Sequence, residues 1–565
     1  MTTKTTKTMK KQIFLGAALL LLTASCSNND TTNEDEKGKV NVAQAVNFTV
    51  DFADYNAEQE VGVTRAGEAN KEEKLEQQAI DLGNGILAMC TLQRDNTKQE
   101  KPAATRALPN DTYTMMAYDA ATKAFKGEMT GTVSGGAFTP ADAQKRILLE
   151  PGTYDFVLFN SKVSRSGNNL TVNRSDAATA MIGRTQQTIN STPKQQQVAF
   201  TMKHAGAKVK IQVIGYMDFS GVTATLESVN ATDIPGSSVY DAVTGTWTAG
   251  GGVALSANTT YGGSSNIGTR YVVNSNEEIA FMPATDVSKL KLTFNSGSIY
   301  LQNMANKSLT FSPATPLTLE QNGAYVLNVK LMYNFLYLMS DGSTGLFDKT
   351  TYGGGTKTPI GIVVSRSRHL AIALQDANSG SIYQWTTNNN FFWPQVNTNM
   401  KKNFNEMLAL ENGYDETWDA NCTTAIVTGE KVKGKRADFP AFKAAADYGP
   451  MLPVGVNLTN GMENRKWHLP AFGEWKYVFT ELGFLNMAQV TNWNNDYNWY
   501  GHLANVAFTQ VGGTGIGRSV WYWTSSEYNN YNAGYVDITP LDISFGYSYL
   551  KKDRIFVRAF IKYKD

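Results

Sequence analysis

The sequence predicts a mainly β, multidomain protein, and its length, composition and strand pattern each support this. At about 100–200 residues per domain, the 565 residues correspond to roughly three or four domains. Hydrophobic residues make up 42% and charged residues 18%, which supplies several cores and excludes a disordered chain. Many short alternating runs between turn residues favour β-sandwiches over a βαβ sheet.

The charge balance and the few cysteines exclude several classes of protein. With 51 Lys+Arg against 50 Asp+Glu, a net charge of +1 gives no basis for nucleic-acid binding. Three Cys exclude a disulfide-stapled scaffold and a Cys-rich zinc array, and four His leave few ways to build a His-based metal site. We expect Cys90 and Cys422 to be unpaired thiols, with a bridge between them as the alternative, and we expect no cofactor.

The first residues predict a secretory signal over 1–25. Four lysines precede the apolar run 13–22, which is too short to cross a bilayer, since a span takes about 20 residues. The small residues 23–25 then lead to Cys26 in a pattern that resembles the lipobox of bacterial lipoproteins, although Thr23 stands where that motif usually has Leu. The resemblance implies a lipid such as palmitate on Cys26; an ordinary cleaved signal is the alternative.

Residues 26–45 are expected to form a polar tether, because Ser27 to Glu36 contains no apolar residue that could join a core. An acidic tether after a lipidated Cys resembles the surface-export signals of Bacteroidales lipoproteins. This implies an outer-membrane lipoprotein precursor on the cell surface, which contacts the membrane only through its lipid.

The middle of the chain alternates apolar and polar residues with the period of half-buried strands, and turn-forming residues separate the runs. The segment 72–80 fits either a helix or a loop. The clearest predicted strands are 46–52, 113–118, 152–159, 208–213, 289–294 and 325–331.

Two sequence motifs in this region resemble those of a known family. Phe200-Thr-Met-Lys-His-Ala-Gly-Ala-Lys-Val209 resembles the M-x-H-x-x-A-K-V junction of Bacteroidales fimbrillin-like proteins, the type V pilins, and residues 281–283 with 316–329 are similar to that family's closing strands. The resemblance implies two tandem transthyretin-like β-sandwich domains, 46–205 and 206–335. We expect His204, at their joint, to be a packed and hydrogen-bonded structural residue.

The same resemblance implies a route of assembly. In this family an arginine-specific protease cuts an early loop, removes the first strand with the lipid, and a stalk pilin subunit fills the groove with a strand of its own. Two sites fit, Arg65 followed by Ala66 and Arg106 followed by Ala107. An ordinary surface arginine is the alternative for each. We favour Arg106, because a longer removable segment precedes it.

Residues 336–565 differ in composition and pattern from the residues before them. Most of the tryptophans lie here, and amphipathic helices are predicted over 402–410 and 471–482. The phrases Trp467-His-Leu-Pro-Ala-Phe-Gly-Glu-Trp475, Tyr522-Trp-Thr-Ser-Ser-Glu527 and Arg554-Ile-Phe-Val-Arg558 occur in order. They resemble a bacterial C-type-lectin-like domain of the kind first noted in Fibrobacter, with Ala471 departing from the usual Ser or Thr. The resemblance implies an α+β lectin-like adhesin domain.

The motif residues have a structural interpretation. Trp467, Trp475 and Trp523 are expected to anchor the core, and Glu474 and Glu527 to hold loops rather than to perform acid–base chemistry. Trp493-Asn-Asn-Asp496 only partly matches the calcium motif of lectins, so the sequence gives no support for a metal.

An aromatic and Asn-rich region is the predicted ligand surface, because Tyr and Trp supply rigid contact area and Asn supplies polar contacts for a sugar or a protein of a host or bacterial surface. The candidate residues are Trp493, Asn494, Asn495, Asp496, Tyr497, Trp499, Tyr500, Tyr528 and Tyr531.

The sequence predicts no enzyme. A formylglycine-generating activity, which the lectin-like fold also supports, relies on cysteines, and this region contains only Cys422. Hydrolase, metalloprotease and phosphate-loop motifs do not occur, and a pairing of Cys422 with His468 or His502 is the remaining catalytic alternative.

Taken together, the two resemblances imply a minor, tip subunit of a pilus that accepts a donor strand and adheres through its C-terminal domain. The alternative is a lipidated surface protein that binds a glycan or protein without polymerising. Cleavage after Arg65 or Arg106 would distinguish the two.

Overall fold

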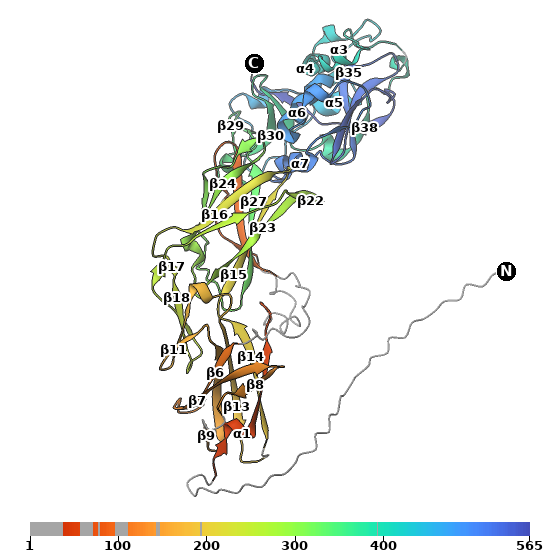
Figure 1. Cartoon of the computed structure of the whole chain (residues 1–565). Coiled ribbons are helices and arrows are strands. Elements are labelled where there is room, and N and C mark those ends of the chain that lie inside the picture. The colour runs from red at the N-terminus through yellow and green to blue at the C-terminus, as the bar shows by residue number, and fades with distance from the viewer. Residues whose placement is uncertain are drawn as a thin grey trace, which may run out of the picture.

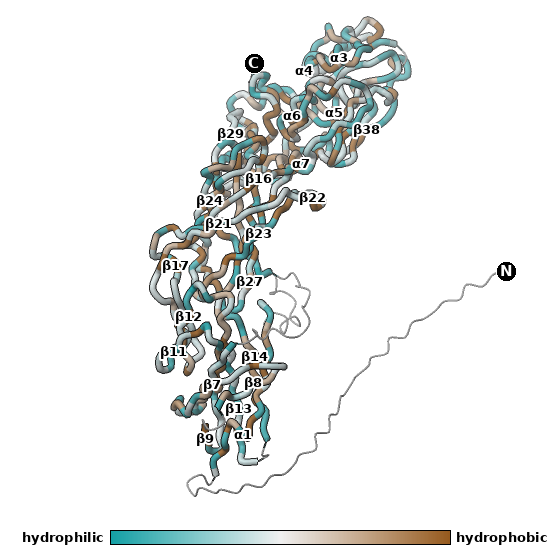
Figure 2. Tube along the Cα trace, viewed as in Figure 1, coloured by the Kyte–Doolittle hydropathy of each residue, from teal (hydrophilic) through white to brown (hydrophobic). Residues whose placement is uncertain are grey.

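The computed structural model describes residues 38–56, 72–76, 79–95, 111–142, 147–192, 195–392 and 394–564. Cys26, Arg65, Ala66, Arg106 and Ala107 lie outside these ranges. The molecule is mainly β and elongated, with the first strands at one end and the C-terminal residues at the other (Figure 1). Apolar and polar residues alternate along the strands of the long body, as expected where one face of each strand is buried (Figure 2).

The first unit is a closed barrel rather than two separate sheets, with strand order β10-β13-β14-β2-β8-β7-β6. Phe48 packs against Phe138, Phe156 and Phe200 in its core, with ring centroids 6.0–6.1 Å apart. Its strands are β2 (Val46–Phe52), β6 (Thr112–Asp119), β7 (Phe125–Ser134), β8 (Ala137–Pro140), β10 (Gly152–Asn160), β13 (Met181–Ile189) and β14 (Gln196–His204), with β1 (Val40–Asn41), β9 (Leu148–Leu149) and the helix α1 (Val42–Ala45) at one end.

The second unit packs two sheets over one core. The larger contains β3 (Glu73–Lys74), β4 (Ile80–Asp81), β5 (Ile86–Arg94), β15 (Ala207–Gly215), β22 (Ser265–Ile267), β23 (Arg270–Phe281) and β27 (Ala324–Tyr333). The other contains β16 (Ser220–Ser228), β21 (Ser256–Thr260), β24 (Leu290–Ile299), β25 (Gln302–Asn303) and β26 (Lys307–Thr310).

A third sheet links the two units, because β12 of the first pairs with β18 of the second along five residues, Asn169–Asn173 with Ser237–Asp241. A Cβ at Gly206 would lie 2.6 Å from the carbonyl oxygen of Ala177, so the chain needs glycine to pass between the units. The short strands here are β11 (Ser164–Ser166), β12 (Asn169–Asn173), β17 (Ile234–Pro235), β18 (Ser237–Asp241), β19 (Trp247–Ala249) and β20 (Gly252–Val253).

The joint residue His204 is structural, as predicted. Its ring stacks on Tyr55 at 4.1 Å and its Nδ1 lies 3.1 Å from the carbonyl oxygen of Ala178. The six predicted strands of this region are all present.

Strand β5 departs from the predicted division of the chain. The first sandwich was expected to hold residues 46–205, whereas β5 runs antiparallel to β27 in the second unit, from Ile86 opposite Tyr333 to Arg94 opposite Tyr325. Period-2 alternation identifies a strand but not its partner, which is why the sequence could not place it. The undecided segment 72–80 is neither a helix nor a plain loop, since its described residues hold β3 and the start of β4, both paired with β5.

Glu76, next to β3, is a buried carboxyl that we expect to make stability depend on pH. Its Oε1 accepts a hydrogen bond from the Cys90 N–H, and its buried Oε2 has no partner among the described residues. Burial raises the pKa of Glu76 from 4.5 to about 7, while the Cys90 N–H and Lys74 oppose this shift. Because the folded-state pKa is the higher one, stability is present at low pH and is lost as pH rises through this range.

We therefore expect the melting temperature of Glu76→Gln to fall less than that of the wild-type chain when the pH is raised from 5 to 8. Thermal unfolding at the two pH values measures this, with exposed Glu150→Gln as the control that keeps the wild-type fall. An equal fall in Glu76→Gln would contradict the assignment.

The C-terminal unit has two six-stranded sheets and short helices. One sheet holds β28 (Tyr337–Met339), β29 (Thr344–Gly345), β30 (Pro359–Ser365), β31 (Leu370–Ala373), β33 (Trp467–His468) and β39 (Phe560–Lys562). The other holds β32 (Ile382–Gln384), β34 (Tyr497–Asn498), β35 (Val520–Glu527), β36 (Ala533–Ile538), β37 (Asp542–Gly546) and β38 (Arg554–Phe556). The helices are α3 (Phe404–Leu408), α4 (Gly413–Trp418), α5 (Pro440–Ala446), α6 (Trp475–Gly483) and α7 (Gly501–Thr509).

Both helices predicted in this unit are present in shortened form, as α3 and α6. Phe484, which ends α6 in a left-handed conformation, packs against Tyr333 at 5.2 Å and Tyr300 at 6.3 Å in the second unit. The second unit and the C-terminal unit therefore share one apolar core (Figure 1).

Candidate functional site

Strands β2 and β5 form the first candidate site, because they are the long strands that the early part of the chain supplies to the first and the second unit. In β5 the side chains of Ile86, Ala88, Cys90 and Leu92 are 0–4% exposed and lie in the core of the second unit. In β2 the apolar side chains face the barrel core, and the strand lies between β14 and β8.

Each of these strands covers an edge. Nine residue pairs join β5 to β27, and seven join β2 to β14 in parallel register. If both strands were removed, the backbone groups of β27 and β14 would lose their partners, and the apolar pockets that β5 and β2 fill would open. Such a groove accepts an extended strand with small or apolar side chains at every second position.

The tryptophans of the C-terminal motifs lie in the core of this unit, as the sequence predicts. Trp467 is 4% exposed, and Trp475 and Trp523 are fully buried. The carboxylate of Glu474 accepts a hydrogen bond from the backbone N–H of Ala471 at 2.7 Å. Glu527 accepts from the N–H groups of Val396 and Asn397, so both glutamates hold loops.

Two lysines that were not predicted from the sequence complete this network. Lys551 is fully buried and donates to Glu527, and Lys433 is buried and donates to Glu416 at 2.8 Å. Burial raises the pKa of Glu527 and lowers that of Lys551, while their mutual attraction opposes both shifts. Neither lysine stands in a hydrophobic pattern or a motif, so no sequence signal identified them.

Two of the residues predicted for the ligand surface lie elsewhere in the structure. Trp499 is a core residue, 5% exposed, with its indole N–H donating to the carbonyl of Thr539 at 2.9 Å. Tyr500 belongs to the joint, since its hydroxyl donates to Asp218 and its ring lies 6.2 Å from Tyr271 of the second unit. Trp499 is therefore buried away from any external ligand, and the half-buried Tyr500 has its hydroxyl engaged by Asp218.

The rest of that surface remains accessible in part. Trp493 packs edge-on against Tyr528 at 5.3 Å, and Tyr528 stacks on Tyr547 at 4.0 Å. Tyr497 is tied to the same loop by its hydroxyl, which accepts from the Asn492 N–H. The exposed members are Asn494, Asn495, Asp496 and Tyr531, the last 45% exposed.

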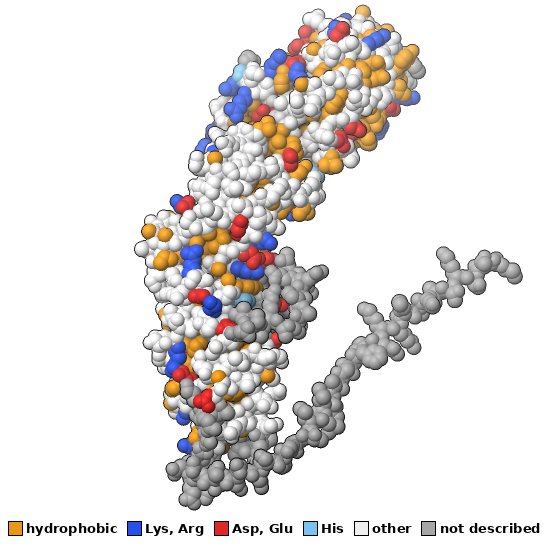
Figure 3. Space-filling view, in the orientation of Figure 1, with side chains coloured by type: hydrophobic (Ala, Val, Ile, Leu, Met, Phe, Trp, Pro, Cys, Tyr) orange, Lys and Arg blue, Asp and Glu red, His pale blue; other side chains and the backbone are white. Residues whose placement is uncertain are grey.

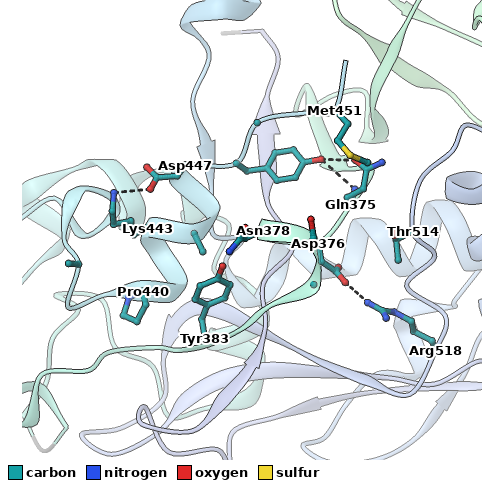
Figure 4. A pocket seen from close by; sticks show the side chains of 16 residues that line it. Gln375, Asp376, Asn378, Tyr383, Pro440, Lys443, Asp447, Met451, Thr514 and Arg518 are labelled. Carbon is teal, nitrogen blue, oxygen red and sulfur yellow. Dashed lines mark hydrogen bonds and ion pairs between the residues drawn. The ribbon is translucent and has the colours of Figure 1, made fainter. Parts of the chain in front are cut away.

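A cleft of about 760 Å³ provides a second candidate ligand site in the C-terminal unit (Figure 4). Asp376 lies at its base, where it accepts hydrogen bonds from Arg518, the Tyr522 hydroxyl at 2.8 Å and fully buried Arg558 at 2.7 Å. Two guanidinium groups thus share one carboxylate. At the rim, Lys443 pairs with Asp447 at 2.8 Å.

The backbone beside this cleft is strained. Asn378 and Ser379 both have positive φ, 46° and 56°, which non-glycine residues rarely adopt in succession. The Asn378 and Tyr383 side chains point toward one another in the cleft (Figure 4). No pattern in the sequence had indicated that Asn378, Ser379 and Tyr383 line a cleft.

The surroundings of Cys422 do not favour its use as a catalytic nucleophile. Burial raises the pKa of the Cys422 thiol to about 11, with Glu416 contributing, which opposes formation of a nucleophilic thiolate. Cys90 and Cys422 are both unpaired. No cluster of metal-ligating side chains occurs among the described residues. Over the same residues, no helix combines the length and apolarity that a membrane span requires.

The family model of fimbrillin-like proteins matches residues 54–340, so the chain belongs to the fimbrillin-like family. Among solved structures, a fimbrial protein from Bacteroides ovatus is similar at 13% identity, with 92% of this chain and 99% of that chain covered and a TM-score of 0.22. A candidate cell adhesion protein from Bacteroides uniformis is 17% identical over 42% of this chain and 92% of its own, with a TM-score of 0.26. No curated protein matches the chain.

Proposed function

We propose that this fimbrillin-like protein is a minor, terminal subunit of a type V pilus that accepts a strand from a stalk pilin and adheres through its C-terminal unit. The observation that carries the proposal is the position of β2 and β5. Both precede Arg106 in the sequence, and each completes a different unit. A single cut after Arg106 would therefore release both strands and leave a groove that extends over both units.

The two candidate cuts would have different consequences. A cut after Arg65 would release only β1 and β2 and leave β5 on β27. A cut after Arg106 would also free the β27 edge, which offers a longer groove to a donor strand. This favours Arg106 as the maturation site.

The segment directly after β27 supports the terminal position. A stalk subunit needs a further strand that it can donate to its neighbour. Here Phe335 and Tyr337 lie fully buried in the shared core, and β28 pairs with β30 in the C-terminal unit. This segment is thus committed to the subunit's own fold, which suits a subunit that accepts a strand without donating one.

A pair of variants in the native bacterium tests the proposal. We expect Arg106→Lys, which keeps the charge but resists an arginine-specific protease, to remain full-length and absent from surface filaments. The matched variant Arg65→Lys should enter filaments as the wild type does. Normal incorporation of Arg106→Lys would overturn the Arg106 assignment. A wild-type chain that is never cut and never enters filaments would favour the second candidate, a lipidated surface protein that binds without polymerising.

A further inference from the structure

We propose that a basic cleft at one edge of the C-terminal unit binds an acidic polysaccharide, one that carries sulfate or carboxylate groups along its chain. The cleft has a volume of about 790 Å³. This inference rests on the proposed function, because it takes the C-terminal unit as the part of the chain that binds a ligand. The proposed site is distinct from the aromatic surface and from the Asp376 cleft.

The sheet register brings the basic side chains together. Leu370 of β31 lies opposite Lys562 of β39, and Trp467 of β33 lies opposite Ile561 of the same strand. The ends of three adjacent strands therefore meet, and the residues just beyond them line one cleft. The five cations that line it are Arg368, Arg465, Lys466, Lys562 and Lys564.

The acidic residues that line the cleft pair with only part of its cationic lining. Three line it, and Glu411 is already paired with Arg368 at 2.6 Å and with Lys476. Glu474 is 2% exposed and its carboxylate accepts from the Ala471 N–H. Arg465 also has a partner, so the positive charge offered to a ligand comes from Lys466, Lys562 and Lys564, with Asp415 as the remaining lining carboxylate.

The lysines are presented for contact. Among the described residues, Lys466, Lys562 and Lys564 form no ion pair. The Nζ of Lys466 lies 4.7 Å from the ring centre of Trp418, and the Nζ of Lys562 lies 5.7 Å from that of Tyr414. Each ring holds an ammonium group from one side, and an anion can approach from the solvent side, since Lys466 is exposed and Lys562 is half-buried. Lys and Arg side chains gather around the C-terminal end of the chain in Figure 3.

The chemistry of the cleft favours a sugar chain over other polyanions. Tyr414 and Tyr477 add aromatic surface to the cationic lining, and flat rings with polar neighbours suit pyranose rings. A cleft of this size holds a few ligand units rather than a duplex, and the near-neutral chain lacks the extended basic surface that nucleic acid requires.

Binding of the purified full chain to three immobilised polysaccharides tests the inference: heparin for sulfate, polygalacturonate for carboxylate and dextran as the neutral control. We expect binding to heparin, polygalacturonate or both, and none to dextran. The preferred acidic probe identifies the anionic group. Raising the salt from 0.1 M to 1 M, where the screening length falls from about 10 Å to about 3 Å, should abolish binding.

The double variant Lys466→Glu/Lys562→Glu should weaken that binding more than about tenfold, because two attractive contacts become repulsive. The matched control is Lys402→Glu/Lys552→Glu, which makes the same charge change at exposed lysines elsewhere on the unit and should bind as the wild type does. If the first double variant melts early, Lys466→Ala/Lys562→Ala replaces it.

Four results would overturn the inference: no binding to either acidic probe at 0.1 M salt, binding that survives in the cleft variants, an equal loss in the control, or equal affinity for duplex DNA. Because the assay is independent of pilus assembly, a failure here leaves the incorporation test with Arg106→Lys intact.

Discussion

Replacing Lys551 with Met is expected to destabilise the C-terminal unit by about 3–5 kcal/mol, because it leaves an unpaired carboxylate in the core. The Nζ of Lys551 donates to Glu527 and to the carbonyl oxygens of Pro394 at 3.0 Å and Asn530 at 2.9 Å. Both members of the pair are fully buried, so water cannot replace these contacts. The substitution removes the donor while the acceptors stay in place.

Denaturant unfolding followed by tryptophan fluorescence measures this loss, because all tryptophans except Trp247 lie in the C-terminal unit. The exposed control Lys402→Met should change stability by no more than about 0.5 kcal/mol. The double variant Glu527→Gln/Lys551→Met should lose less unfolding free energy than the two single variants together, since neither charge is left without its partner. A Lys551→Met chain as stable as the control would refute this account of the loop network.

A chain that begins at Ala107 is expected to be stabilised by a peptide with the sequence of residues 86–94. Without β5, the β27 edge and the pockets for Ile86, Ala88, Cys90 and Leu92 are open, and the peptide restores the register. The melting temperature of the chain should rise with peptide concentration, as it does for any ligand that binds only the folded state.

Peptide variants make this test specific. Ala88→Asp in the peptide should weaken binding more than about a hundredfold, because Ala88 is fully buried and a carboxylate there has no partner. Gln93→Asp, on the half-buried opposite face of the strand, should bind nearly as well as the parent peptide. Equal binding of the two variants, or a chain that melts at the full-length temperature without peptide, would contradict the groove.

Six strands of the first two units could be predicted from the sequence, because their apolar and polar residues alternate. Pairing over long distances could not be predicted in this way. The partner of β5 lies more than 200 residues away, from Ile86 opposite Tyr333 to Arg94 opposite Tyr325, and alternation says nothing about which edge a strand will join.

The candidate site was harder to predict for a related reason. Trp499 and Tyr500 are residue types that are common in binding surfaces. Trp499 nevertheless packs in the core, and Tyr500 lies at the joint with the second unit. Aromatic residues serve both purposes, and composition alone does not distinguish them. The Asp376 cleft and the basic cleft each draw on loops far apart in the chain, so only the folded structure brings their residues together.

The central claim is that the chain is cut and assembled, and the N-terminus of the protein in filaments sheared from intact cells tests it most directly. The account predicts a chain that starts at Ala107, lacks β2 and β5, and is recovered with stalk pilins. A chain that still begins at a lipidated Cys26, with none of the protein in the filament fraction, would contradict it.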